Sequence, residues 1–257
     1  MKDIIVAKFG GSSLADGNQF MKVKDIITGD SRRRYIIPSA PGKRYSEDHK
    51  ITDLLYMCHQ LASHRINFDE VYAIISKRYE DICTELGLKL NIKEILSEIK
   101  VGITGDASGD YAASRGEYLN AIILSEYLGF EFVDASEMII FDCDNNFDLE
   151  KTRVKIRAKL EEIPYAVIPG FYGENEKGEI VTFSRGGSDI TGSVIASAVE
   201  CDLYENWTDV SGFLMADPKI VSDPKPIKSI TYKELRELSY MGAPVLHEEA
   251  VFPIKHT

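Results

Sequence analysis

The sequence predicts an α/β fold, a three-layer sandwich in which helices cover both faces of a mostly parallel sheet. Short apolar runs, typical of buried parallel strands, alternate along the chain with helical patterns. The length agrees with this, because 257 residues can bury a full core and lie at the upper end for one domain. The predicted strands cover residues 4–6, 35–37, 130–133, 166–168 and 202–207.

The predicted helices between these strands differ in pattern. In residues 110–128 apolar side chains recur at steps of three and four, as on one buried helix face. Residues 148–163 carry many charges of both signs, which favours a solvated surface helix. A polar turn at 174–178 indicates a hairpin over residues 171–182, and the charged residues 42–50 suit a solvated loop or a lid. The predicted helices cover residues 16–27, 51–61, 69–86, 110–128 and 148–163.

Composition excludes several classes of protein. The formal net charge of −11 argues against a nucleic-acid binder, which normally presents a basic face. No apolar run approaches the roughly 20 residues needed to span a bilayer, and none near the N-terminus resembles a signal peptide. We expect a cytoplasmic protein whose four widely spaced cysteines are buried, reduced thiols. These are Cys58, Cys83, Cys143 and Cys201.

Residues 184–192 (SRGGSDITG) combine a cation, adjacent glycines, a hydroxyl and a carboxylate just before a helix of small residues. Two glycines let the backbone approach a ligand closely, and the N–H groups at the start of a helix favour an anion. Arg185 could place its guanidinium fork on a carboxylate or a phosphate. The pattern indicates an anion site.

A second glycine motif, residues 8–13 (KFGGSS), follows the first predicted strand. It places the Lys8 ammonium beside the backbone N–H groups of Gly10, Gly11 and Ser12, an arrangement that suits a nucleotide polyphosphate. The chain has neither a Walker A motif nor a G-x-G-x-x-G fingerprint. Each motif alone could be a tight strand-to-helix turn, but the two together indicate a nucleotide site.

These residues suit phosphoryl transfer, which needs positioning and neutralisation of charge more than covalent help. Lys8 is the candidate to neutralise the developing charge. Asp189 would repel a phosphate, so it either holds Lys8 by an ion pair or contacts Mg²⁺ indirectly. Arg185 suits the unreactive carboxylate of a dicarboxylate substrate. Glu117 suits an ammonium group, although the sequence alone favours an ordinary solvated helical charge.

The chain resembles the aspartokinases of the amino-acid kinase superfamily from about residue 4 to about residue 253. This resemblance implies an amino-acid kinase fold and ATP-dependent phosphorylation of the side-chain carboxylate of L-aspartate to 4-phospho-L-aspartate. That reaction opens the lysine, threonine and methionine branch of amino-acid biosynthesis, and Mg²⁺ would arrive with ATP. The motifs that carry the resemblance are KFGGSS at 8–13, SAPG at 39–42, SRGE at 114–117, PGF at 169–171, RGGSD at 185–189 and WTDV at 207–210.

The resemblance also assigns residues to the two substrates. It places Glu117 and Arg185 in the aspartate pocket together with Ser39, Thr52, Phe171 and Ser188. Adenosine would be held by Thr208, Asp209 and Lys219. The chain departs from the family at three positions: Leu214 and Lys219 replace the usual Tyr and Arg, and Pro244 replaces a Lys that many aspartokinases place on the phosphates.

The resemblance further divides the chain into a substrate-binding part, about residues 1–165, and a nucleotide-binding part, about residues 166–257. Aspartokinases continue into paired ACT regulatory domains, which we do not expect within these residues, and a homodimer is possible. Three alternatives stay open: a kinase of glutamate or acetylglutamate, a catalytically weak nucleotide-binding module lacking the lysine at 244, and a dinucleotide oxidoreductase. The last lacks its glycine fingerprint.

Overall fold

The computed structural model describes residues 3–105, 107–184, 186–209, 212, 214–215, 220–231, 233–235 and 237. Its main sheet has five strands in the order β3-β5-β2-β1-β8, and all neighbouring pairs run parallel. The prediction of a largely parallel sheet is therefore confirmed, and each strand overlaps its predicted run. The strands are β1 (Ile5–Phe9), β2 (Arg33–Pro38), β3 (Glu131–Phe132), β5 (Ala166–Val167) and β8 (Leu203–Trp207).

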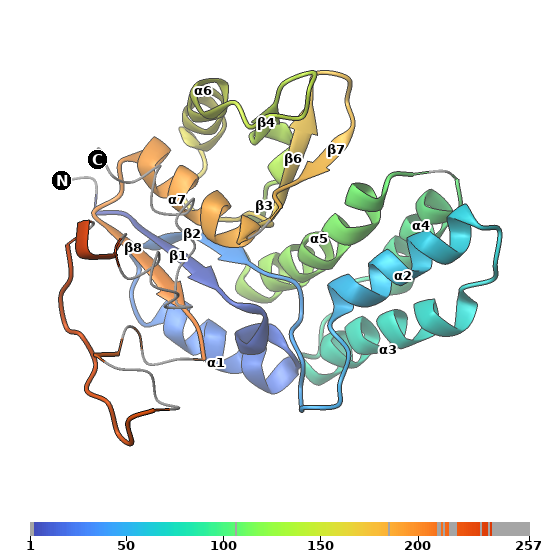
Figure 1. Ribbon diagram of the computed structural model, residues 1–257, viewed down its shortest axis with the longest axis horizontal. Coiled ribbons are helices and arrows are strands. Elements are labelled where there is room, and N and C mark those ends of the chain that lie inside the picture. The colour runs from blue at the N-terminus through green and yellow to red at the C-terminus, as the bar shows by residue number, and fades with distance from the viewer. Residues whose placement is uncertain are drawn as a thin grey trace.

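Alternation along the central strands builds the three layers. In β2, Ile36 belongs to one hydrophobic core, whereas its neighbours Tyr35 and Ile37 belong to the other, because successive side chains of a strand point to opposite faces. Figure 1 shows α6 and α7 on one side of the sheet and α1 on the other. The helices are α1 (Gly17–Thr28), α2 (Ile51–Ser63), α3 (Asp69–Glu85), α4 (Ile92–Thr104), α5 (Gly109–Leu128), α6 (Leu149–Leu160) and α7 (Gly187–Val199), with the 3-10 turns η1 (Gly11–Leu14) and η2 (Ala135–Glu137).

Two helices differ from the sequence prediction. Helix α4 was not predicted, although Ile92, Leu96, Ile99 and Ile103 line its buried side at helical spacing. Helix α5 is buried around most of its circumference rather than on one face. The reason is that α2 packs against it on one side, while β2, β5 and the hairpin strand β7 (Ile180–Thr182) contact it on others. Helix α5 therefore carries polar residues, Glu117 among them, into the interior.

A second, smaller sheet stands beside the first (Figure 1). Its strands are β4 (Ile140–Phe141), β6 (Tyr172–Asn175) and β7 (Ile180–Thr182), in that order. Strands β6 and β7 form the predicted hairpin, and β4 was not predicted. The Asn175 side chain stabilises the turn by accepting hydrogen bonds from the backbone N–H groups of Lys177 and Glu179, both at 3.0 Å.

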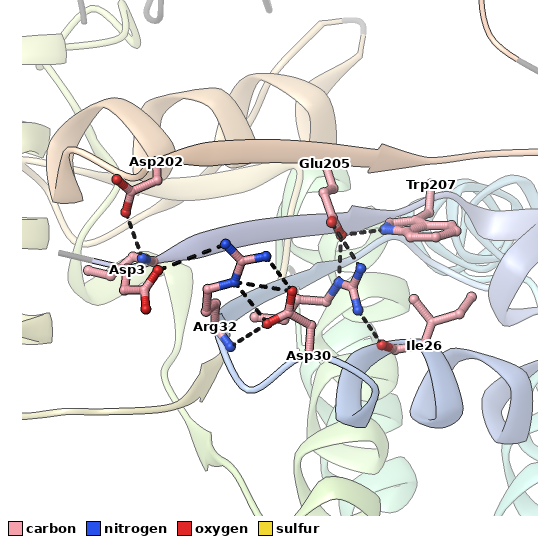
Figure 2. A network of polar contacts seen from close by, with 9 residues as sticks. Asp3, Ile26, Asp30, Arg32, Asp202, Glu205 and Trp207 are labelled. Carbon is pink, nitrogen blue, oxygen red and sulfur yellow. Dashed lines mark hydrogen bonds and ion pairs between the residues drawn. The ribbon is translucent and has the colours of Figure 1, made fainter. Parts of the chain in front are cut away.

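A polar network fixes edge strand β8 against β1 and β2 (Figure 2). The Arg33 guanidinium forks onto Glu205 at 2.7 and 3.0 Å and also donates to the Ile26 carbonyl at 2.6 Å. The Trp207 indole N–H donates to the same Glu205 carboxylate at 2.8 Å, and its ring stacks on Phe9 at 6.0 Å. The carboxyl end of β8, which leads to Thr208, is therefore held in place.

The cysteine prediction is only partly right. Cys58 and Cys83 are buried, Cys201 is half-buried and Cys143 is exposed, and all four are free thiols. Burial raises the pKa of the Cys58 thiol to about 12 and that of Cys83 to about 11. These two side chains therefore serve as small core residues. Among the described helices, none is long and apolar enough to cross a membrane.

Candidate active site

A pocket of about 310 Å³ opens at the carboxyl ends of the central strands, where parallel α/β sheets bind ligands. Seven of the residues predicted for the site line it together: Lys8, Ser39, Thr52, Glu117, Phe171, Ser188 and Asp189. They come from β1, the loop after β2, helices α2, α5 and α7, and the segment between β5 and β6. Arg185 and Lys219 lie outside the described residues.

An ion pair forms the cationic end of this pocket. The Lys8 ammonium, on β1, lies 2.8 Å from Oδ1 of Asp189, in the first turn of α7. Both side chains are mostly buried, so solvent screens the pair little. Of the two roles considered for Asp189, the structure shows the ion pair with Lys8. Asn206, which the sequence analysis did not single out, donates to the same Asp189 oxygen at 3.1 Å, because β8 pairs with β1 in a register that places Asn206 beside Lys8.

The glycines before α7 allow the chain to turn into this site. Gly186 has a left-handed backbone conformation with φ of 58°, which favours glycine. A Cβ at Gly187 would lie 2.7 Å from the Phe171 ring, so only glycine lets α7 approach so closely. Phe171 itself has φ of 81°, a rare conformation for a bulky residue that tends to occur at functional sites. Its backbone N–H is held by the Thr191 hydroxyl at 3.1 Å.

Glu117 forms the acidic end of the pocket. The residue is 6% exposed, and its Oε2 is buried without a hydrogen-bond partner in the structure. Burial raises the pKa of the Glu117 carboxyl to about 8, while backbone hydrogen bonds, from Ala40 first, and the charge of Lys8 oppose the rise. An unpaired buried carboxylate is unfavourable, so this oxygen is poised to receive a cationic donor. The solvated alternative for Glu117 is therefore wrong.

This burial predicts a gain in stability when the carboxyl is replaced. In the absence of ligand, Glu117→Gln should raise the melting temperature at pH 8 by about 3 °C or more, with little change at pH 5. The pKa of the Glu117 carboxyl in the folded protein lies above its ordinary value of 4.5, so the unmodified protein loses stability progressively as pH rises from 4.5 towards 8. Calorimetric scans from pH 5 to 8 measure the difference. A gap between the two proteins that stays constant with pH would contradict it.

In the glycine loop after β1, one of the three predicted backbone donors is already hydrogen-bonded within the protein. The Gly10 N–H donates to the Trp207 carbonyl at 2.9 Å, so it is already used within the protein. The Gly11 and Ser12 N–H groups, at the start of η1, have no acceptor among the residues that the structure describes. A Cβ at Gly11 would lie 2.7 Å from the Ala40 carbonyl oxygen, which explains the second glycine. Two of the three predicted backbone donors are thus available to an anion.

Thr208 and Asp209 follow β8 and are exposed, as expected for residues at the open end of a sheet. The Thr208 hydroxyl donates to the Asp209 carboxylate at 3.2 Å. The stacked rings of Phe9 and Trp207 lie immediately before the two motif loops. The structure therefore brings the two sequence motifs, one after β1 and one after β8, to the same edge of the sheet.

Comparison with known proteins agrees with this arrangement. The model of the amino acid kinase family matches residues 3–257. The chain is 38% identical over 262 residues to Aspartokinase 3 of Bacillus subtilis, covering 96% of this chain and 58% of that protein. The chain thus spans a little over half the length of such relatives.

Two solved structures are similar to this fold. The aspartate kinase of Clostridium acetobutylicum superposes with a TM-score of 0.94 at 60% identity, over 98% of this chain and 58% of that one. Aspartokinase III of E. coli, solved with aspartate and ADP, superposes with a TM-score of 0.83 at 27% identity, over 97% of this chain and 59% of that one.

Proposed function

The chain belongs to the amino acid kinase family, and we propose that it transfers the γ-phosphoryl group of ATP to the side-chain carboxylate of L-aspartate. One observation carries the proposal: a single pocket holds the Lys8–Asp189 ion pair at one end and, at the other, the buried Glu117 carboxyl, whose Oε2 has no hydrogen-bond partner among the described residues. Such a pocket accepts a small zwitterion beside a phosphate. The similarity to aspartate kinases supports aspartate as that zwitterion.

In the proposed complex, Glu117 pairs with the substrate ammonium and loses its own proton on binding. Arg185 forks onto the α-carboxylate, and Ser39, Thr52, Phe171 and Ser188 shape the walls. This binding leaves the β-carboxylate directed towards Lys8. The assignment gives each of the three charged groups of aspartate one partner of opposite or complementary charge.

The reaction requires no general base, because the attacking carboxylate is already ionised. One of its oxygens forms a bond to the γ-phosphorus while the bond from phosphorus to the β–γ bridging oxygen breaks, and ADP leaves with that electron pair. Lys8 stabilises the negative charge that spreads over the phosphoryl oxygens in the transition state. Asp189 keeps the ammonium aimed at that point, with Asn206 orienting Asp189.

The nucleotide would lie along the edge formed by the two motif loops, with the Gly11 and Ser12 N–H groups on its phosphates. Thr208, Asp209 and Lys219 would hold adenosine. Among the described residues there is no cluster of three or more His, Cys, Asp or Glu side chains that could hold a metal. In the proposed complex, Mg²⁺ would be carried by the phosphates and water, as it commonly is in phosphoryl-transfer sites.

Trapping the product tests the proposal. With Mg-ATP and hydroxylamine, the chain should form a hydroxamate from L-aspartate and not from L-glutamate, because the pocket fixes the distance between the ammonium end and Lys8. Colorimetric detection of the iron–hydroxamate complex, with ADP release in parallel, measures both. Equal turnover of the two amino acids, or turnover of acetylglutamate alone, would exclude aspartate specificity, and ATP binding without any turnover would favour the nucleotide-binding module.

A further inference from the structure

The loop of residues 42–50 is anchored rather than freely solvated. Most of its side chains are exposed, but Asp48 is 5% exposed and points inward. The Asp48 carboxylate accepts from the Arg78 guanidinium at 2.6 Å, and from the Arg44 backbone N–H and Nε at 3.0 and 2.8 Å. These bonds hold the pKa of the Asp48 carboxyl well below its usual range, chiefly through Arg44. The loop that the sequence suggested as a solvated excursion or a lid is thus held in place by the hydrogen bonds and ion pairs of Asp48.

Arg78 also donates to two backbone carbonyls beside the glycine loop that follows β1. From helix α3, its Nη1 donates to the Gly42 carbonyl at 3.1 Å and to the Ala15 carbonyl at 3.4 Å. Ala15 ends the η1 turn. Gly42 in turn donates its N–H to the Gly11 carbonyl at 2.8 Å. One guanidinium therefore connects the residue that follows η1 to the anchored loop, and the Gly42 N–H extends this connection to Gly11.

The glycine loop after β1 and the loop of residues 42–50 are packed in close contact at Gly42. A Cβ at Gly42 would lie 2.6 Å from the Gly11 carbonyl carbon and 2.7 Å from the Ser12 nitrogen. The Gly42 backbone therefore packs directly against the Gly11–Ser12 peptide, which carries the Ser12 N–H, one of the two predicted phosphate donors.

Burial of the charged Arg78 guanidinium is by itself unfavourable for the stability of the fold. The residue is 3% exposed, its Nε is buried without a partner in the structure, and burial lowers the pKa of the guanidinium. A buried ion pair is often no more stabilising than apolar side chains of similar volume. Its geometry, with donors to two backbone carbonyls of neighbouring loops, points to a positional role.

We propose that Arg78, neutralised by Asp48, is a positioning residue that sets the Gly11–Ser12 backbone donors on the nucleotide phosphates. This inference rests on the proposed function for the location of ATP, but not for the identity of the amino-acid substrate. It assigns Arg78 to nucleotide binding although it lines no part of the aspartate pocket.

Nucleotide binding measured by titration calorimetry tests this role. Arg78→Met should raise the Kd of Mg-ATP about tenfold or more, as expected when hydrogen bonds from a charged group are lost, while the KM of aspartate changes less than twofold. Lys77→Met is the matched control, because Lys77 neighbours Arg78 on α3 and, among the described residues, makes only a surface ion pair with Asp81. It should leave the Kd of Mg-ATP unchanged.

A second variant covers the case in which Arg78→Met does not fold. Arg78→Lys keeps the charge beside Asp48 but cannot reach both carbonyls, so its Kd for Mg-ATP should rise about threefold. A folded Arg78→Met or Arg78→Lys protein with the Kd of the unmodified chain would overturn the proposal, as would equal weakening of ATP and aspartate. If the unmodified chain binds ATP without phosphorylating aspartate, the proposed function fails while the Kd comparison still decides on Arg78. Absence of ATP binding by the unmodified chain would overturn both.

Discussion

Replacement of Lys8 by methionine is expected to lower kcat for aspartate phosphorylation by about two to four orders of magnitude. Methionine preserves much of the length and the apolar stem of the side chain but removes the ammonium. Lys8 is mostly buried and lies 2.8 Å from Asp189, so its charge is preorganised in a place where water screens it little. The transition state should then lose the fixed cation that Lys8 supplies, whereas methionine fills much of the same volume in the pocket. Initial rates with saturating Mg-ATP and aspartate measure the loss.

Two companion variants separate charge from packing. Lys22→Met alters an exposed lysine of α1 and should leave kcat within about twofold. Asp189→Asn keeps the ammonium but removes its partner, so kcat should fall less than in Lys8→Met, by about tenfold to a hundredfold. A Lys8→Met protein that retains kcat within a few-fold of the unmodified chain would show that Lys8 does not stabilise the transition state.

Much of the fold could be predicted because its signals are local. The buried parallel strands are short apolar runs, and the glycine motifs occur where a strand gives way to a turn. Helix α4 could have been found from Ile92, Leu96, Ile99 and Ile103, which repeat at helical spacing. The burial of α5 on most sides could not, because it follows from which elements surround the helix and not from its own pattern.

The candidate site likewise has some features that the local sequence predicts and others that depend on tertiary packing. Lys8 and Asp189 could be paired in advance because a carboxylate beside a phosphate site needs a cation. The burial of Glu117 depends on how tightly α5 packs on its neighbours, and the sequence pattern does not determine that. The hydrogen bond from the Gly10 N–H to the Trp207 carbonyl depends on the register between β1 and β8. Asp48 lies in a loop and Arg78 lies on α3, 30 residues further along the chain. Only the fold shows that the two form an ion pair beside the glycine loop.

If aspartate binds as proposed, the buried Glu117 carboxyl should make its binding depend on pH. Its pKa is raised to about 8 in the protein without ligand, so below that pH most molecules hold a protonated, neutral Glu117. Only the ionised form pairs with the substrate ammonium. Aspartate binding must therefore release a proton, and its apparent affinity should weaken as pH falls. The phosphates of bound ATP add negative charge nearby and should move the transition upward rather than downward.

We therefore expect kcat/KM for aspartate, with saturating ATP, to rise about tenfold per unit between pH 6.5 and 7.5 and to level off above pH 8. Glu117→Gln should lower kcat/KM at pH 8 by about 30-fold to 1,000-fold, the loss typical when one partner of a buried charge pair is removed. It should also abolish the rise with pH, because glutamine has no proton to lose. The internal control is kcat/KM for ATP at saturating aspartate, which should not show this rise between pH 6.5 and 7.5. A limb of equal slope in the Glu117→Gln protein would assign the titration to another group, and a flat profile in the unmodified chain would mean that Glu117 is already ionised before aspartate binds.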